Sequence, residues 1–112
     1  MSITGDLIRG HTDAIILVRL LHGDSYGYEI NKTISTLSGG RFELKEATLY
    51  TAFKRLEEAG CIVSYWGSGG TGARRRYYTI TPEGRAECTR LQQDWLETKE
   101  IMDQLLETRE EK

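Results

Sequence analysis

The most regular hydrophobic pattern in the chain lies between Glu46 and Ala59. Apolar residues recur there at positions i, i+3, i+4 and i+7, namely Leu49, Ala52, Phe53 and Leu56. This spacing places all of them on one stripe and predicts an α-helix with a single buried face.

The opposite face of this helix combines small, hydroxyl-bearing and basic side chains. Its centre holds Ala47, Thr51 and Lys54, and its edges hold Thr48, Tyr50 and Arg55. Short side chains let a helix approach the floor of a DNA major groove, where lysine or arginine reaches phosphates and guanines. The face is therefore a candidate recognition surface, with an ordinary solvated helix as the alternative.

A second helix is predicted over residues 11–22, and it is apolar on nearly every side. Residues 14–18 are all apolar, and Leu20 and Leu21 follow. Such a helix must be covered on more than one side. Because a short chain has little material for this, we expect a second subunit to contribute, although the chain's own core is the alternative.

Weaker patterns lie between these two helices. Asp24 and Ser25 supply N-cap chemistry for a helix over residues 26–37. The run 38–40, which contains two glycines, is expected to terminate this helix. Residues 41–44 alternate between polar and apolar side chains and predict one short strand.

A β-hairpin is predicted over residues 61–80. Residues 61–66 and 75–80 are rich in β-branched and aromatic residues, and the glycine-rich run 67–73 separates them. The basic residues directly after that run are Arg74, Arg75 and Arg76. A glycine-rich tip followed by arginines is typical of a wing that grips DNA phosphates, and a solvated charge cluster is the alternative.

The last predicted helix is long. Thr81, Pro82 and Glu83 supply a cap, a first-turn proline and an acid at the positive end of the helix dipole. The helix is expected to reach about Glu110, and its apolar seam is Cys88, Leu91, Trp95, Thr98, Met102 and Leu105. A three-helix core cannot cover so long a seam, so we expect a partner helix.

These elements predict a mainly α fold with a small β-hairpin. The arrangement is a winged helix-turn-helix DNA-binding domain over residues 1–81, with its wing at 61–80, followed by a dimerisation helix over 82–112. The expected dimer interface comprises Ile15, Leu91, Trp95, Met102 and Leu105.

Composition changes this picture only in part. The chain has 112 residues and a formal net charge of −2, which at first argues against a nucleic-acid partner. However, residues 41–85 hold eight basic and five acidic side chains, whereas residues 94–112 hold three basic and seven acidic ones. The middle of the chain is thus basic. With no membrane span and no signal peptide in the sequence, we expect a cytoplasmic protein.

Little in the sequence suggests catalysis. Cys61 and Cys88 form no C-x-x-C motif, and neither they nor His11 and His22 have metal-ligand spacing. No nucleophile motif, paired acids or phosphate loop is present. We expect no enzyme activity, no metal and no cofactor.

The segments YGYEI, EATLYTAFKRLEEAG, SYWG and RRRYYTITPEG, in this order, resemble the PadR family of bacterial transcriptional regulators. The resemblance covers nearly the whole chain. It implies that the third helix enters the major groove and that the wing contacts the DNA backbone. The implied contacts are Thr48, Tyr50, Thr51 and Lys54 from the helix, and Arg74, Arg75 and Arg76 from the wing. Many members have proline in place of Thr51.

The chain is also similar to a lactococcal member of that family in ATLYT, FKRLE, SYWG and Trp95. In that member flat drugs bind in a pore at the dimer interface, between two tryptophans. The resemblance implies a ligand site at Ala14, Val18, Cys88, Gln92, Trp95 and Lys99. Gln92 replaces an aromatic residue and Lys99 an acidic one, so a lysine there would repel planar cations. The alternative for Trp95 is packing in the dimer core.

The expected function is that of a homodimeric repressor, bound to a double-stranded DNA operator and released by a small planar ligand. A winged-helix module that binds another protein is the alternative. Arginines beside a glycine tip favour DNA, whereas an affinity that is insensitive to salt would favour a protein partner.

Overall fold

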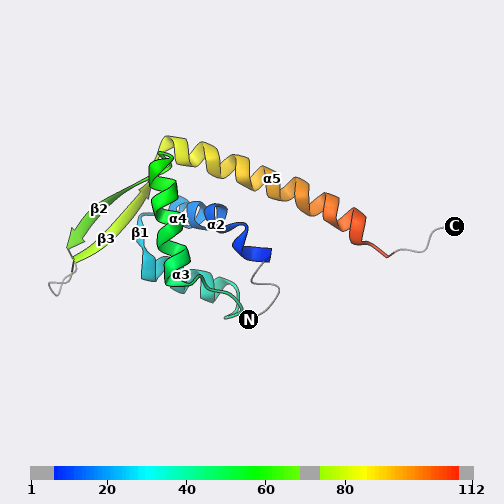
Figure 1. Ribbon diagram of the computed structural model, residues 1–112, viewed down its shortest axis with the longest axis horizontal. Coiled ribbons are helices and arrows are strands. Elements are labelled where there is room, and N and C mark those ends of the chain that lie inside the picture. Colours follow the sequence, from blue (N-terminus) through cyan, green and yellow to red (C-terminus); the bar gives the residue numbers. More distant parts are fainter. Residues whose placement is uncertain (1–6, 69–73, 109–112) are drawn as a thin grey trace.

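The computed structural model describes residues 7–68 and 74–108. Its elements, in chain order, are α2 (Thr12–Leu21), β1 (Ser25–Tyr26), α3 (Gly27–Leu37), α4 (Glu46–Glu58), β2 (Ile62–Ser68), β3 (Arg74–Ile80) and α5 (Pro82–Leu106) (Figure 1). The helices, the hairpin and the long last helix confirm the predicted fold class.

The three strands form one antiparallel sheet in the order β1-β3-β2. The hairpin pairs Ile62 with Ile80 at its base and Ser68 with Arg74 at the last described pair. The third strand is β1, which pairs with β3. The predicted glycine-rich tip lies partly outside the described residues, because 69–73 fall in the gap.

The predicted strand over Arg41 to Leu44 is wrong, because those residues form no strand. The Asn31 side-chain amide donates to the carbonyl of Leu44 at 2.7 Å, and its oxygen accepts from the Leu44 N–H at 2.8 Å. One side chain thus satisfies both backbone groups that a neighbouring strand would otherwise pair.

The predicted cap of α3 is also wrong. Tyr26 occupies the N-cap position and makes no side-chain cap hydrogen bond. Ser25 belongs to β1 instead and its hydroxyl donates to Glu29 at 2.5 Å, while the Asp24 carboxylate accepts from the Tyr65 hydroxyl at 2.6 Å. Ser25 therefore pairs with β3 as part of a strand and does not cap α3.

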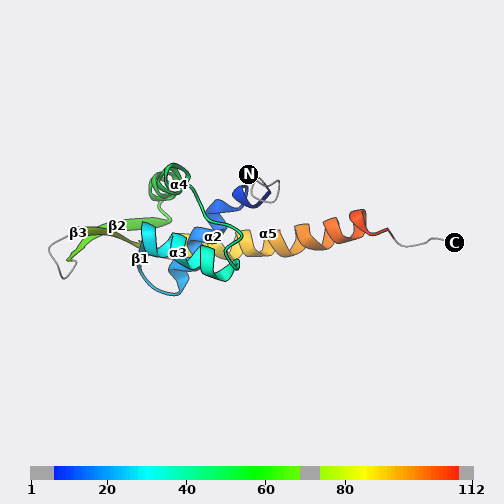
Figure 2. The same cartoon turned by 90° about the horizontal axis from the view of Figure 1, so that it is seen from below.

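Thr81 caps α5 as predicted, since its hydroxyl oxygen accepts from the Gly84 N–H at 3.0 Å. The helix ends at Leu106, short of the predicted Glu110, and Glu107 already has an extended backbone. The C-terminal part of the helix projects away from the rest of the molecule (Figures 1 and 2). The described apolar residues there are exposed.

The core lies where α2, α3, α4, the first turns of α5 and the sheet meet. Its most completely buried side chains are Phe53, Ile16, Leu17, Leu20, Ile30, Ile62 and Cys88. Phe53 stacks on Tyr78 of β3 with ring centroids 3.9 Å apart, which fixes α4 against the sheet. Cys61 and Cys88 are both buried free thiols, and burial raises the pKa of each.

Gly84 permits the closest backbone approach in the described core. A Cβ at this position would collide with the carbonyl oxygen of Cys61 and would lie 2.8 Å from Cγ1 of Ile80. Glycine is therefore what allows the first turn of α5 to rest directly on the end of α4 and the start of β2. This contact sets the direction in which α5 leaves the sheet.

Candidate functional site

The outward face of α4 is fully presented to solvent. The four residues of the predicted apolar stripe are buried, as expected, and Ala47, Thr51 and Lys54 are exposed on the opposite side. Lys45 precedes the helix without providing a side-chain cap. The face thus carries small and basic groups with no apolar cover.

Both edges of this face contact a neighbouring element. On one edge the Tyr50 ring packs edge-on against Phe53, with centroids 5.5 Å apart. The Tyr50 hydroxyl lies over Gly27, where an added Cβ would be only 2.7 Å away. The predicted contact residue Tyr50 is therefore held against the start of α3.

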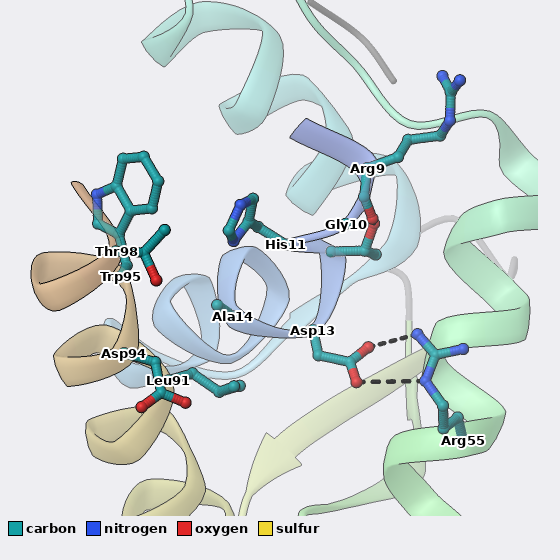
Figure 3. Close-up of a pocket in the computed structure, with 11 residues that line it drawn as sticks. Arg9, Gly10, His11, Asp13, Ala14, Arg55, Leu91, Asp94, Trp95 and Thr98 are labelled. Carbon is teal, nitrogen blue, oxygen red and sulfur yellow. Dashed lines mark hydrogen bonds and ion pairs between the residues drawn. The ribbon is translucent and has the colours of Figure 1, made fainter. Parts of the chain in front are cut away.

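On the other edge, Arg55 forms an ion pair with Asp13 of α2. Its Nε donates to Oδ2 of Asp13 at 3.2 Å and its Nη2 donates to Oδ1 (Figure 3). This pair, which sequence analysis missed, raises the pKa of Arg55 through the hydrogen bond to Asp13. Since the partners are far apart in sequence, no local pattern could have identified it.

Each wing arginine is exposed and lies over an aromatic ring. Arg74 lies 4.8 Å from the Trp66 centroid, Arg75 lies 4.8 Å from Tyr26, and Arg76 lies 5.9 Å from Tyr78. Cation–π attraction limits the positions that these long side chains adopt, while their charges stay in water. The three guanidinium groups are thus partly ordered along β3.

Glu57 joins α4 to the wing. One of its carboxylate oxygens accepts from the Ser64 hydroxyl at 2.8 Å, and the other lies 3.5 Å from Arg76. The C-terminal end of α4 is therefore tied to both strands of the hairpin. Glu57 therefore links the exposed helix α4 directly to the basic strand β3.

A mostly apolar groove of about 620 Å³ lies between α2, the end of α3 and α5. Four of the six predicted ligand residues line it: Ala14, Val18, Gln92 and Trp95. Cys88 is fully buried in the core instead, and Lys99 lies outside the lining. The other residues of the lining were not predicted for a ligand site, namely Ile8, His11, Ile15, Arg19, Ile34, Leu37, Ser38, Phe42, Leu91 and Leu96.

Trp95 lies at the meeting point of this groove and a second hollow of about 470 Å³. Its indole is edge-on to His11, with ring centroids 5.2 Å apart (Figure 3). Trp95 remains 46% exposed, so a large aromatic surface is left uncovered.

The residues of the predicted dimer interface fall into two groups. Ile15 and Leu91 are partly buried and pack against the core, whereas Trp95, Met102 and Leu105 are exposed. Leu96, Ile101 and Leu106 add to the exposed apolar surface of α5. A single chain leaves this surface unpartnered.

Two features that would indicate other functions are absent from the described residues. No group of three or more His, Cys, Asp or Glu residues within 7–68 and 74–108 is arranged to hold a metal ion. In that same part of the chain, no helix is both long and apolar enough to cross a membrane.

Comparisons with known proteins point to one family. Residues 16–90 match the model of the Transcriptional regulator PadR-like family. A transcriptional regulator from Clostridium thermocellum has a similar structure, with a TM-score of 0.85 and 44% identity, covering 96% of this chain and 99% of that one. A PadR family transcription regulator from Clostridium difficile has a TM-score of 0.74 and 38% identity, covering 87% and 99%.

An uncharacterized protein of Lysinibacillus sphaericus is 46% identical over 105 residues, which is 94% of this chain and 96% of that protein. The finer likeness to the lactococcal regulator stays a prediction.

Proposed function

The chain belongs to the PadR-like family of transcriptional regulators, so it is a DNA-binding regulator and not an enzyme, and we propose that it acts as a homodimeric repressor. In this proposal residues 1–81 bind the operator and residues 82–112 hold two subunits together. In this proposal the protein works in the cytoplasm, together with the operator DNA that it binds.

One observation carries the proposal: the exposed helix α4 is joined through Glu57 to a strand that bears three exposed arginines. We assign Thr48, Tyr50, Thr51 and Lys54 to the major groove and Arg74, Arg75 and Arg76 to the backbone. A helix with its side chains is about as wide as the major groove, so α4 fits without rearrangement. The ordered guanidinium groups suit phosphates.

The unpartnered surface of α5 supports the dimer. Met102 is 43% exposed and Leu105 is 72% exposed, although both lie on the predicted seam. Burying such side chains against a symmetry-related helix would stabilise a dimer relative to two separate chains. A two-fold dimer would also present two copies of α4 to successive half-sites.

We propose further that a small planar ligand binds in the groove at Trp95 and releases the operator. The groove opens on the face of α5 that a second subunit would cover, so a guest there would contact both subunits. A ligand that binds one subunit arrangement better than another shifts the population toward it and alters the spacing of the two α4 helices.

Operator affinity should fall steeply with salt. If the dimer neutralises about six to eight phosphates, log K should fall against log salt with a slope of about −5 to −7. Lys54→Ala and Arg75→Ala should each reduce the magnitude of this slope. Fluorescence anisotropy with labelled duplex at several salt concentrations measures it.

Thr89→Ala, on the exposed surface of α5, serves as the control and should leave that slope unchanged. A salt-independent affinity of the wild type would favour a protein partner, and unchanged slopes in both variants would remove Lys54 and Arg75 from the interface.

Planar aromatic compounds should quench Trp95 fluorescence, because an indole that stacks on a guest loses emission. Lys99 lies one turn beyond Trp95, so neutral or anionic compounds should bind better than cations. The measurement is a fluorescence titration of the wild type against Trp95→Ala. Trp66 on the wing is the internal control, and binding that survives the loss of Trp95 would count against this site.

A further inference from the structure

A third hollow lies on one edge of α4. It has a volume of about 360 Å³ and is lined by Arg9, Thr12, Ala47, Thr48, Thr51 and Arg55. Its polar side chains are thus two guanidinium groups and three hydroxyls. All of these groups donate hydrogen bonds, and the two arginines carry positive charge.

The fold brings both arginines to the same edge of α4. Thr12 is buried, and its hydroxyl donates to the carbonyl of Arg9 at 2.7 Å, which ties the turn before α2 to that helix. From this turn the Arg9 side chain extends toward the segment that leads into α4 (Figure 3). The start of α2 and the segment before it therefore meet α4 at this hollow.

Asp13 orients Arg55 and does not block it. The carboxylate engages Nε and Nη2, while the third guanidinium nitrogen, Nη1, points away from Asp13 (Figure 3). A bidentate pair of this kind holds the planar guanidinium in one direction and leaves donors at its outer end. Arg55 remains 53% exposed, so an approaching anion can reach it.

The position of the hollow indicates which anion it meets. When a helix lies in the major groove, its outer face meets the bases and its two edges face the phosphate backbones on either side. Tyr50 stands on one edge of α4, whereas Thr48 and Arg55 stand on the other. The hollow is therefore on the side of α4 where one DNA strand must pass.

We propose that Arg9 and Arg55, together with the hydroxyls of Thr48 and Thr51, form a phosphate-binding cleft for the DNA backbone beside α4. This inference rests on the proposed function. It adds to that function a contact from the segment before α2 and assigns Thr48 and Thr51 to the backbone in addition to the bases. Because phosphates are the same at every base pair, the cleft strengthens binding to any duplex.

The test compares the full-length protein with Arg9→Gln and Arg55→Gln on two labelled duplexes, one from the region around its own gene and one of random sequence. Each variant should reduce the magnitude of the salt slope by about 0.9 per lost phosphate contact, or about 1.8 for a dimer. The reduction should be equal on both duplexes. Arg55→Lys should keep most of the slope, because it keeps the charge.

Arg90→Gln is the matched control, because Arg90 is also an exposed arginine in ion pairs but lies on α5. It should behave as the wild type, and thermal melting of every variant verifies that the fold persists. The proposed cleft is refuted if the wild type binds DNA and both cleft variants keep its salt slope. It is also refuted if the slope is reduced on only one of the two duplexes. In either case the proposed function of the protein still stands. If the wild type binds no duplex, the proposed function falls together with the cleft.

Discussion

Replacing Met102 and Leu105 together with glutamate should abolish dimerisation. Each buried side chain of this size contributes about 1.5–3 kcal/mol, and a two-fold interface loses two copies of each. The dimer would therefore lose about 6 kcal/mol or more, which corresponds to a Kd at least four orders of magnitude higher. Sedimentation velocity at micromolar concentration should show monomer or aggregate in place of dimer.

The exposed residues Glu100 and Asp103 on the same turns provide the control. Exchanging both for glutamine changes the charge without removing apolar surface, so the dimer should persist. A wild-type protein that sediments as a well-folded monomer at micromolar concentration would refute the dimer itself. An unaffected dimer in the double glutamate variant would place the interface elsewhere.

Gly84→Ala should destabilise the fold strongly, although alanine is intrinsically the better helix former by about 1 kcal/mol. The new methyl group would collide with the backbone carbonyl of Cys61 and approach Ile80 at 2.8 Å. Because backbone cannot turn aside as a flexible side chain does, the cost should reach about 3 kcal/mol or more. For a domain of this size the melting temperature should fall by about 10–20 °C.

Gly10→Ala is the matched control for this substitution. An added Cβ at Gly10 would meet only the carbonyl oxygen of Leu7, at an ordinary distance of 3.7 Å. Its melting temperature should stay within a few degrees of the wild type, by differential scanning calorimetry. Equal melting temperatures for the two alanine variants would mean that α5 rests on β2 less closely than described.

The parts of the fold that the sequence predicted are those in which the signal is local. The stripe of Leu49, Ala52, Phe53 and Leu56 repeats within one helix, and the strands of the hairpin are separated by a short glycine-rich run. The cap at Thr81 is likewise contained within four residues. In each case the residues that interact are neighbours in sequence, so their spacing carries the information.

The errors and omissions arise where distant residues interact. β1 has only two residues, and it pairs with Tyr77 and Tyr78, which lie about 50 residues later in the chain, in strand β3 of the wing. Residues 41–44 alternate as a strand does, but Asn31 supplies the missing backbone partner from α3. The ion pair of Asp13 and Arg55 joins positions 42 residues apart.

The candidate groove was predicted in part for the same reason. Heptad spacing treats Cys88, Leu91 and Trp95 as equivalent seam positions. In the fold, packing against α2 buries Cys88 completely, half-covers Leu91 and leaves Trp95 open. Sequence periodicity identifies the seam along α5. How far the core extends along α5 decides which seam residues are buried within the chain and which remain exposed for a partner.

The two buried thiols give this protein a built-in reporter of its own opening. Cys61 is 6% exposed and Cys88 is 0% exposed, and no disulfide joins them. A thiol reagent can reach either sulfur only when the core opens, so the labelling rate measures the population of open molecules. Any duplex or small molecule that binds only the closed form must slow that labelling by mass action. Affinity can thus be read from the native chain without a dye or a tag.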